Sequence, residues 1–177
     1  MKKINRKMSI RDFAVAVAAI LNEENIDVIL TGGAVVSIYT EGKYVSKDAD
    51  FLSATDQQSI KQAMLKAGFK NLGKDFYHDS IDFTVEFPGS ELVIGDEPMK
   101  PEGEIKEGQF TLKLLSPTQC VMDRLAAFYH WKDRQSLEQA VMVAQKHPVK
   151  LLRIKKWSER EGMKDRYEIF LQQVKKD

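Results

Sequence analysis

The stretch that decides the fold is residues 26–52, IDVILTGGAVVSIYTEGKYVSKDADFL. It opens with an almost continuous apolar run, residues 26–30, which is typical of a strand buried on both faces. Thr31, Gly32 and Gly33 interrupt this run, and residues 34–39 are predicted to form a short helix. A strand that leads through paired glycines into a helix presents free backbone N–H groups at the helix N-terminus. Such an N-terminus is a binding site for anions, including phosphate.

Two carboxylates follow within the same stretch. Residues 44–52 are predicted to form the second strand, and Asp48 and Asp50 are separated in it by one residue. Because side chains alternate along a strand, these two carboxylates share one face. Phosphate-binding glycines beside paired carboxylates indicate a site for a metal-bound nucleotide.

The elements on either side complete a mixed α+β core. Ser9 and Asp12 form a capping pattern at the start of a helix that is predicted to run to about residue 25. Residues 56–67 are amphipathic and predict a second long helix, and residues 91–94 and 110–115 predict short strands. The segment between these last two strands, residues 95–108, is rich in glycine, proline and charge and is predicted to be a loop.

A predicted hairpin adds further carboxylates to the site. Its arms are residues 76–78 and 81–87. Alternation in the second arm places Asp82, Thr84 and Glu86 on one face and the apolar residues on the other. If this arm lies beside the strand of Asp48 and Asp50, a third carboxylate joins the pair.

The chain becomes helical after residue 115. Ser116, Pro117 and Gln119 form a strong helix start, with a cap, a proline at the first helical position and a capping-box glutamine. We therefore expect two parts, an α/β core over residues 1–115 and a C-terminal helical region over residues 116–177. His130 and Trp131 are predicted to be packing residues, and Cys120 a buried residue rather than a nucleophile, because no base can be assigned to it.

Composition narrows the possible functions. The chain has 177 residues, 43% hydrophobic and 30% charged, with a formal net charge of +1. This balance gives no global reason to expect nucleic-acid or membrane binding. The single cysteine excludes an internal disulfide and fits a reducing compartment. The apolar run at residues 13–21 is too short to span a bilayer, so we expect a cytoplasmic protein without a membrane partner.

The motifs of residues 31–50 resemble those of the nucleotidyltransferase superfamily, which has the polymerase-beta-like fold. That superfamily carries an apolar strand, Gly-Gly or Gly-Ser, a short helix, and then a Ser/Thr-x-Asp-apolar-Asp strand. The matching motifs here are Thr31-Gly32-Gly33 and Ser46-Lys47-Asp48-Ala49-Asp50. Residues 116–140, SPTQCVMDRLAAFYHWKDRQSLEQA, resemble the segment after the core in small bacterial members, some of them related to toxin–antitoxin nucleotidyltransferases. The resemblance covers roughly residues 10–145.

The resemblance implies a mixed sheet with helices packed on one side, followed by the helical region. It also implies transfer of a nucleoside monophosphate from a nucleoside triphosphate (NTP) to an acceptor hydroxyl, with release of pyrophosphate. Two Mg²⁺ ions, about 3.5–4 Å apart, neutralise the charge that develops in such a transfer. Mg²⁺ prefers carboxylate, phosphate and water oxygens, and Mn²⁺ could take its place.

The implied site residues are as follows. Asp48 and Asp50 would bind the metal, and a third carboxylate would bind the second metal ion and activate the acceptor hydroxyl. Glu86 is favoured for this third position, with Asp82 kept as the alternative. Thr31, Ser37 and Ser46 could each contact phosphate or bond the local backbone. The residues assigned to nucleotide binding are Gly32, Gly33, Ser46 and Arg124.

Two other functions remain open. The chain could be a catalytically inactive nucleotidyltransferase-fold module that binds a partner protein, as an antitoxin does, or a purely structural α+β interaction protein. For the enzyme, the acceptor could be an RNA 3′ end, a protein hydroxyl or a small molecule. Residues 150–177 hold nine Lys/Arg against five Asp/Glu, a surplus of 9 − 5 = 4, which could support RNA through phosphate contacts.

Overall fold

The computed structural model describes residues 4–176. The chain alternates helices and strands up to residue 114 and is helical from there on. In chain order the elements are α1 (Ile10–Glu23), β1 (Ile29–Thr31), α2 (Gly32–Tyr39), β2 (Asp48–Leu52), α3 (Gln57–Lys66), β3 (Lys70–Leu72), β4 (Asp75–His78), β5 (Ile81–Gly89), β6 (Val93–Ile94), β7 (Glu97–Pro98), β8 (Gly103–Glu107), β9 (Phe110–Leu114), α4 (Pro117–Trp131), α5 (Arg134–Lys146), α6 (Leu151–Arg160) and α7 (Lys164–Val174).

The strands form a mixed seven-stranded sheet in the order β3-β4-β5-β2-β1-β9-β8. β2 lies near its centre, parallel to β5 on one side and antiparallel to β1 on the other. β6 and β7 pair in a separate two-stranded ribbon. The strand that carries Asp48 and Asp50 therefore lies directly beside the strand that carries Glu86.

Helix α1 covers one face of this sheet. The ring of Phe13 in α1 lies 5.5 Å from the ring of Phe83 in β5 and 6.3 Å from that of Phe69, which follows α3. Side chains alternate along β5, so Thr84 and Glu86 point to the opposite face, away from α1.

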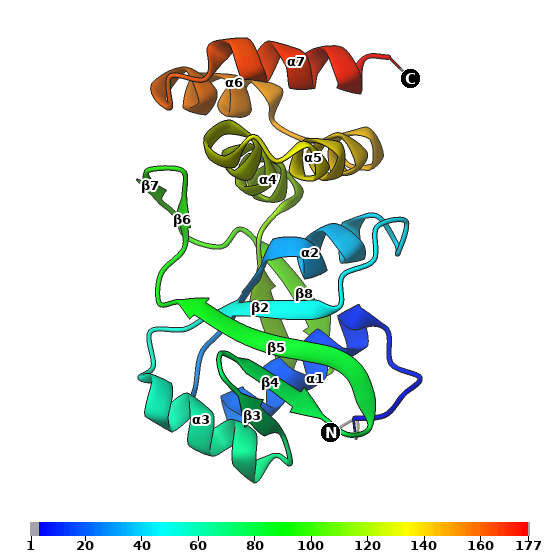
Figure 1. Ribbon diagram of the computed structural model, residues 1–177, viewed down its shortest axis with the longest axis vertical. Helices are drawn as coiled ribbons and strands as arrows, with labels where there is room; N and C mark the ends of the chain where they lie inside the picture. Colours follow the sequence, from blue (N-terminus) through cyan, green and yellow to red (C-terminus); the bar gives the residue numbers. More distant parts are fainter. Residues whose placement is uncertain (1–3, 177) are drawn as a thin grey trace.

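The C-terminal helices form two further layers. Figure 1 shows α4 and α5 lying between α2 and the outer pair, α6 and α7. Trp157 of α6 is fully buried, with its ring 5.5 Å from that of Tyr129 in α4, and its Nε1 donates to the carbonyl oxygen of Ile94 (3.3 Å). The helical region is thus packed against itself and against the β6–β7 ribbon.

Both predicted helix caps are confirmed. The backbone N–H of Asp12 donates to Ser9 Oγ (3.1 Å) at the start of α1. At the start of α4 the backbone N–H of Gln119 donates to Ser116 Oγ (3.3 Å), and the Ser116 N–H donates to Gln119 Oε1 (3.1 Å), which completes the capping box.

Three sequence predictions are wrong. Residues 95–108 are not a plain loop, because they contain β7 and β8, and β8 pairs with β9 along its whole length. β2 begins at Asp48 rather than at residue 44, because Tyr44 is bonded to Ser37 and Thr40 of the α2 end instead of to a strand. His130 and Trp131 are not packing residues: Trp131 is 82% exposed, and His130 is exposed, with its Nε2 3.2 Å from Glu161 Oε2. Cys120 is buried, as expected.

None of the helices within residues 4–176 is long and apolar enough to cross a membrane.

Candidate metal centre

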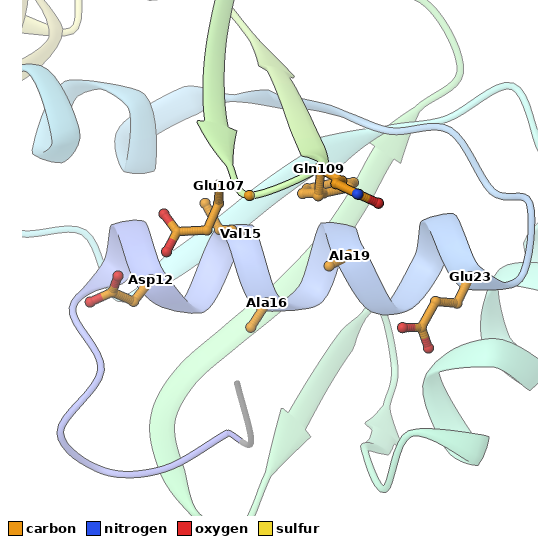
Figure 2. Close-up of a pocket in the computed structure, with 9 residues that line it drawn as sticks. Asp12, Val15, Ala16, Ala19, Glu23, Glu107 and Gln109 are labelled. Carbon is orange, nitrogen blue, oxygen red and sulfur yellow. The ribbon is translucent and has the colours of Figure 1, made fainter. Parts of the chain in front are cut away.

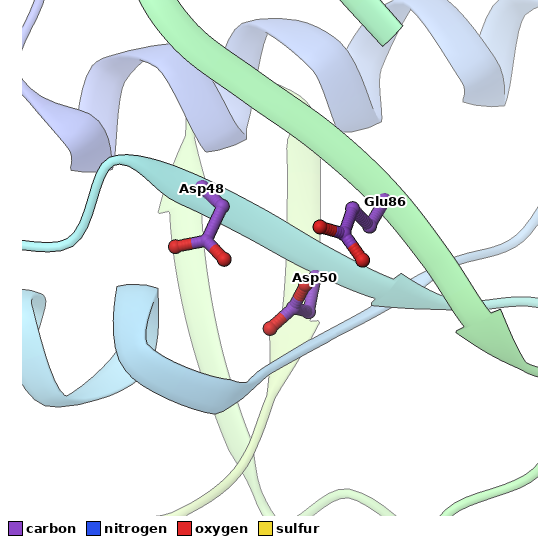
Figure 3. Close-up of side chains that lie close together, drawn as sticks. All are labelled: Asp48, Asp50 and Glu86. Atoms are coloured by element: carbon purple, nitrogen blue, oxygen red, sulfur yellow. The ribbon is translucent and has the colours of Figure 1, made fainter. Parts of the chain in front are cut away.

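Three carboxylates meet on β2 and β5. The parallel register places Asp50 beside Glu86 and Asp48 beside Thr84, so all three carboxylates leave the sheet on the same face. Each offers an oxygen within 4.8 Å of the others, and all three residues are half-buried. Figure 3 shows their side chains directed into one shared space. The structure therefore groups Glu86 with the two aspartates.

Asp82, the alternative third carboxylate, lies elsewhere. It is exposed and stands four residues before Glu86 in β5. It does not belong to the acidic group formed by Asp48, Asp50 and Glu86. The geometry places Glu86 and not Asp82 within reach of a common cation.

The three carboxylates repel one another. Burial, together with the charges of Asp48 and Glu86, raises the pKa of Asp50 to about 6, while Arg124 opposes the shift. A divalent cation held between these oxygens would remove that repulsion. Clustered carboxylate oxygens are the donors that Mg²⁺ prefers, so the residues present fit this ion.

The paired glycines allow the N-terminus of α2 to lie close to the carboxylates. Gly32 is the first residue of α2 and has φ +69°, and a Cβ there would lie less than 3.0 Å from Asp50 Oδ2. A Cβ on Gly33 would lie 2.9 Å from Ser46 Oγ and 3.3 Å from the Tyr44 hydroxyl. The first N–H groups of α2 therefore come close to the carboxylate cluster only because neither residue has a side chain.

Three hydroxyl groups near the site donate hydrogen bonds to protein atoms in or beside it. Ser46 is buried, and its Oγ donates to Asp48 Oδ1 (2.8 Å), which fixes the orientation of that carboxylate. Thr31 Oγ1 donates to the carbonyl oxygen of Asp50 (3.3 Å), and Ser37 Oγ to that of Tyr44 (2.8 Å). Ser46 therefore contacts a carboxylate of the cluster in this structure.

Arg124 brings a positive charge from the helical region. Its Nη2 lies 2.6 Å from Asp123 Oδ2, and its Nη1 donates to Gln139 Oε1 of α5 (3.4 Å). The positive charge of Arg124 opposes the rise in the pKa of Asp50.

Lys74 is a further residue of the site that the sequence did not indicate. It lies between β3 and β4, and its Nζ is 2.9 Å from Glu86 Oε2. Only the pairing of β4 with β5, which sets Asp75 opposite Glu86, brings this lysine to the cluster. No local motif around residue 74 carries that information.

A separate groove of about 650 Å³ lies between α1 and the turn joining β8 to β9 (Figure 2). Its floor includes Ala16 and Ala19, and two of its carboxylates, Asp12 and Glu107, lie 3.7 and 3.6 Å from the guanidinium of Arg11. It shares no residue with the carboxylate cluster, and we assign no reaction to it.

The fold is nucleotidyltransferase-like. A crystal structure of an antigenic nucleotidyltransferase-like protein from Paracoccidioides brasiliensis matches with a TM-score of 0.57, covering 78% of this chain and 77% of that one. The two sequences are 13% identical, so the likeness is one of fold. No protein-family model and no curated relative matches the sequence.

Proposed function

We propose that this chain transfers a nucleoside monophosphate from an NTP to an acceptor hydroxyl, in a Mg²⁺-dependent reaction that releases pyrophosphate. One observation carries the proposal. Asp48, Asp50 and Glu86 bring oxygens within 4.8 Å of one another directly beside the glycine start of α2. A cation site next to a helix N-terminus can bind both parts of a metal–triphosphate complex.

On the donor side, Asp48 and Asp50 would hold the metal, and Ser46 keeps Asp48 in position. The N–H groups of Gly32 and Gly33 face the triphosphate, and Arg124 supplies positive charge from α4. When bound, the metal neutralises negative charge on the phosphate oxygens as the α-phosphorus is attacked. The new bond joins the acceptor oxygen to the α-phosphorus, and the bond that breaks is the one to the bridging oxygen of the departing pyrophosphate.

On the acceptor side, Glu86 takes the proton of the attacking hydroxyl. For this, Glu86 must first lose its ion pair with Lys74. The Lys74 side chain is 77% exposed, so it can move away into solvent. Exposed ion pairs of this kind contribute little stability, so this loss is not costly. RNA 3′ ends, protein hydroxyls and small molecules all suit this chemistry.

We also propose that residues 1–115 carry the carboxylates and glycines of the donor site, and that residues 116–177 form a second unit that contributes Arg124 to it. The support for this division of roles is the positive charge of Arg124 in α4, which acts on the pKa of Asp50.

The Lys74–Glu86 ion pair favours a second candidate, a catalytically inactive module of the antitoxin kind. In such a module Lys74 would stay paired with Glu86, and the site would bind its ligand without catalysing a transfer. Asp48→Ala would then leave the biological function intact, whereas the enzyme would lose activity and keep its fold.

Thermal unfolding with each NTP, with and without Mg²⁺, tests the donor site. A ligand at about 100 times its Kd adds roughly 2.7 kcal/mol of stability. At roughly 2–4 °C per kcal/mol, that raises Tm by several degrees. We expect this rise only with Mg²⁺ and NTP together, retained in Asp82→Ala and lost in Asp48→Ala/Asp50→Ala. No rise with any NTP would refute the donor site.

Transfer itself is tested with an NTP labelled at the α-phosphate. Label that enters RNA or protein in the wild type and not in Asp48→Ala/Asp50→Ala supports the enzyme. A Mg²⁺-dependent Tm rise without any transfer to the three acceptor classes supports the inactive module.

A further inference from the structure

Tyr44 carries a hydroxyl group along one side of α2 to the start of that helix. Its backbone is anchored further along the helix, where its N–H donates to Thr40 Oγ1 (3.1 Å) and its carbonyl oxygen accepts from Ser37 Oγ (2.8 Å). Ser37 lies one turn after Gly33, on the same side of α2. A Cβ on Gly33 would lie 3.3 Å from the Tyr44 hydroxyl and 3.4 Å from Cε1 of the ring. The ring therefore spans this turn and ends beside the paired glycines.

The Tyr44 hydroxyl has no partner in the part of the chain that the structure describes. Within residues 4–176, the hydrogen bonds of Tyr44 all involve its backbone. Tyr39, Tyr129 and Tyr167, the other tyrosines that are not exposed, each bond through the hydroxyl. Every side-chain oxygen or nitrogen of the described residues that is sealed from solvent has a partner. Since Tyr44 is half-buried and its hydroxyl has none, this hydroxyl is in contact with solvent and accessible to a ligand.

This hydroxyl and Glu86 approach the strand of the aspartates from different sides. Ser46 Oγ, which would lie 2.9 Å from the same Cβ of Gly33, donates to Asp48 Oδ1 (2.8 Å), so the Tyr44 hydroxyl lies on the α2 side of the cluster. Helix α2 continues directly from β1, and β1 pairs with one edge of β2. Glu86 comes from β5, which pairs with the other edge of β2. A phosphate bound at the carboxylates therefore has Glu86 on one side and the start of α2 with the Tyr44 hydroxyl on the other.

We infer that the Tyr44 hydroxyl donates a hydrogen bond to the β- or γ-phosphate of the bound NTP, the part that leaves as pyrophosphate. The inference rests on the proposed function and adds a residue to its donor site. The attacking and leaving oxygens lie roughly in line across the transferred phosphorus. With the attacking hydroxyl at Glu86, the leaving phosphates lie on the opposite side, at the start of α2. A phenol O–H can donate there, and a hydrogen bond to an anion is stronger than one between neutral groups.

Titration calorimetry of the full chain with two probes tests the inference. One probe is Mg²⁺ alone, and the other is inorganic tripolyphosphate in saturating Mg²⁺. Tyr44→Phe keeps the ring beside Gly33 and removes only the hydroxyl. It should weaken tripolyphosphate binding about tenfold, from the ordinary strength of a hydrogen bond to a charged group, and leave the binding of Mg²⁺ alone unchanged. Tyr39→Phe is the matched control: its hydroxyl bonds to the Leu115 carbonyl oxygen at the other end of α2, so both probes should bind as in the wild type.

Three results would overturn the inference. If Tyr44→Phe binds tripolyphosphate as tightly as the wild type, the ring only packs against Gly33, and the donor site stands without the phosphate contact. If Tyr44→Phe loses affinity equally for Mg²⁺ alone and for tripolyphosphate, the hydroxyl acts through the carboxylates and not on the phosphate. If the wild type binds neither probe, the donor site and the phosphate contact both fail.

Discussion

Replacing Asp50 with asparagine should stabilise the metal-free protein at neutral pH, although it removes a proposed metal ligand. The pKa of Asp50 is raised to about 6 by burial and by Asp48 and Glu86. A carboxyl with a raised pKa holds its proton more tightly in the folded state than in the unfolded state. Its ionisation therefore lowers the free energy of unfolding as the pH rises from the ordinary 3.8 through about 6. Asparagine has nearly the same shape and cannot ionise.

The structure sets the size of the effect. The difference between about 6 and 3.8 corresponds to at most about 3 kcal/mol, at about 1.36 kcal/mol per pKa unit. Asp50 is only half-buried, and solvent screening reduces this to about 1–2 kcal/mol. For a chain of this size, Tm should rise by about 2–8 °C, at roughly 2–4 °C per kcal/mol.

The assay is thermal unfolding in a chelator between pH 4 and pH 8. Asp50→Asn should unfold at higher temperature than the wild type near pH 7, and the two curves should converge toward pH 4. Asp82→Asn, which changes an exposed carboxylate of β5, serves as the control and should change Tm little at any pH. A lower Tm for Asp50→Asn than for the wild type at pH 7 would refute the cost of ionising Asp50 in the folded state, on which this reasoning rests.

Three further predictions concern neighbouring residues. Gly32→Ala should lose roughly 1–3 kcal/mol in denaturant unfolding, because a Cβ meets Asp50 and φ is +69°. Gly73→Ala, with φ +62° and open space around the Cβ, should lose less, and an equal loss would contradict the contact. Ser46→Ala should weaken Mg²⁺ binding about tenfold in calorimetry, since Ser46 orients Asp48, whereas Ser37→Ala should not; equal effects would count against this. Burial raises the pKa of the Cys120 thiol, so it should react with a thiol reagent only after unfolding, and rapid native labelling would show that it is accessible.

Local patterns were sufficient for much of the fold. The caps at Ser9 and Ser116, the β4–β5 hairpin and the shared face of Asp48 and Asp50 all follow from short-range chemistry. Alternation along β5 also put Glu86 on the face where the structure has it. What alternation could not do was choose between Glu86 and Asp82, since both lie on that face. The parallel pairing of Asp50 with Glu86 makes the choice, and this contact is long-range.

The features that the sequence did not indicate also depend on long-range contacts. β8 has one large apolar residue, Ile105, among glycine and charged residues. Its sequence therefore has no alternating apolar pattern, and only its pairing with β9 makes it a strand. Lys74 reaches Glu86 only through the β4–β5 register. Trp131 was predicted to pack because a tryptophan in an amphipathic helix usually does. It is 82% exposed, and no pattern within α4 could indicate which of its positions the neighbouring elements leave uncovered.

The most direct test of the proposed function is anomalous diffraction from crystals grown with Mn²⁺ and a non-hydrolysable NTP. The proposal predicts a manganese peak within coordination distance of Asp48 and Asp50, with the triphosphate at the N-terminus of α2. A nucleotide bound elsewhere on the chain, or manganese away from these two carboxylates, would contradict it.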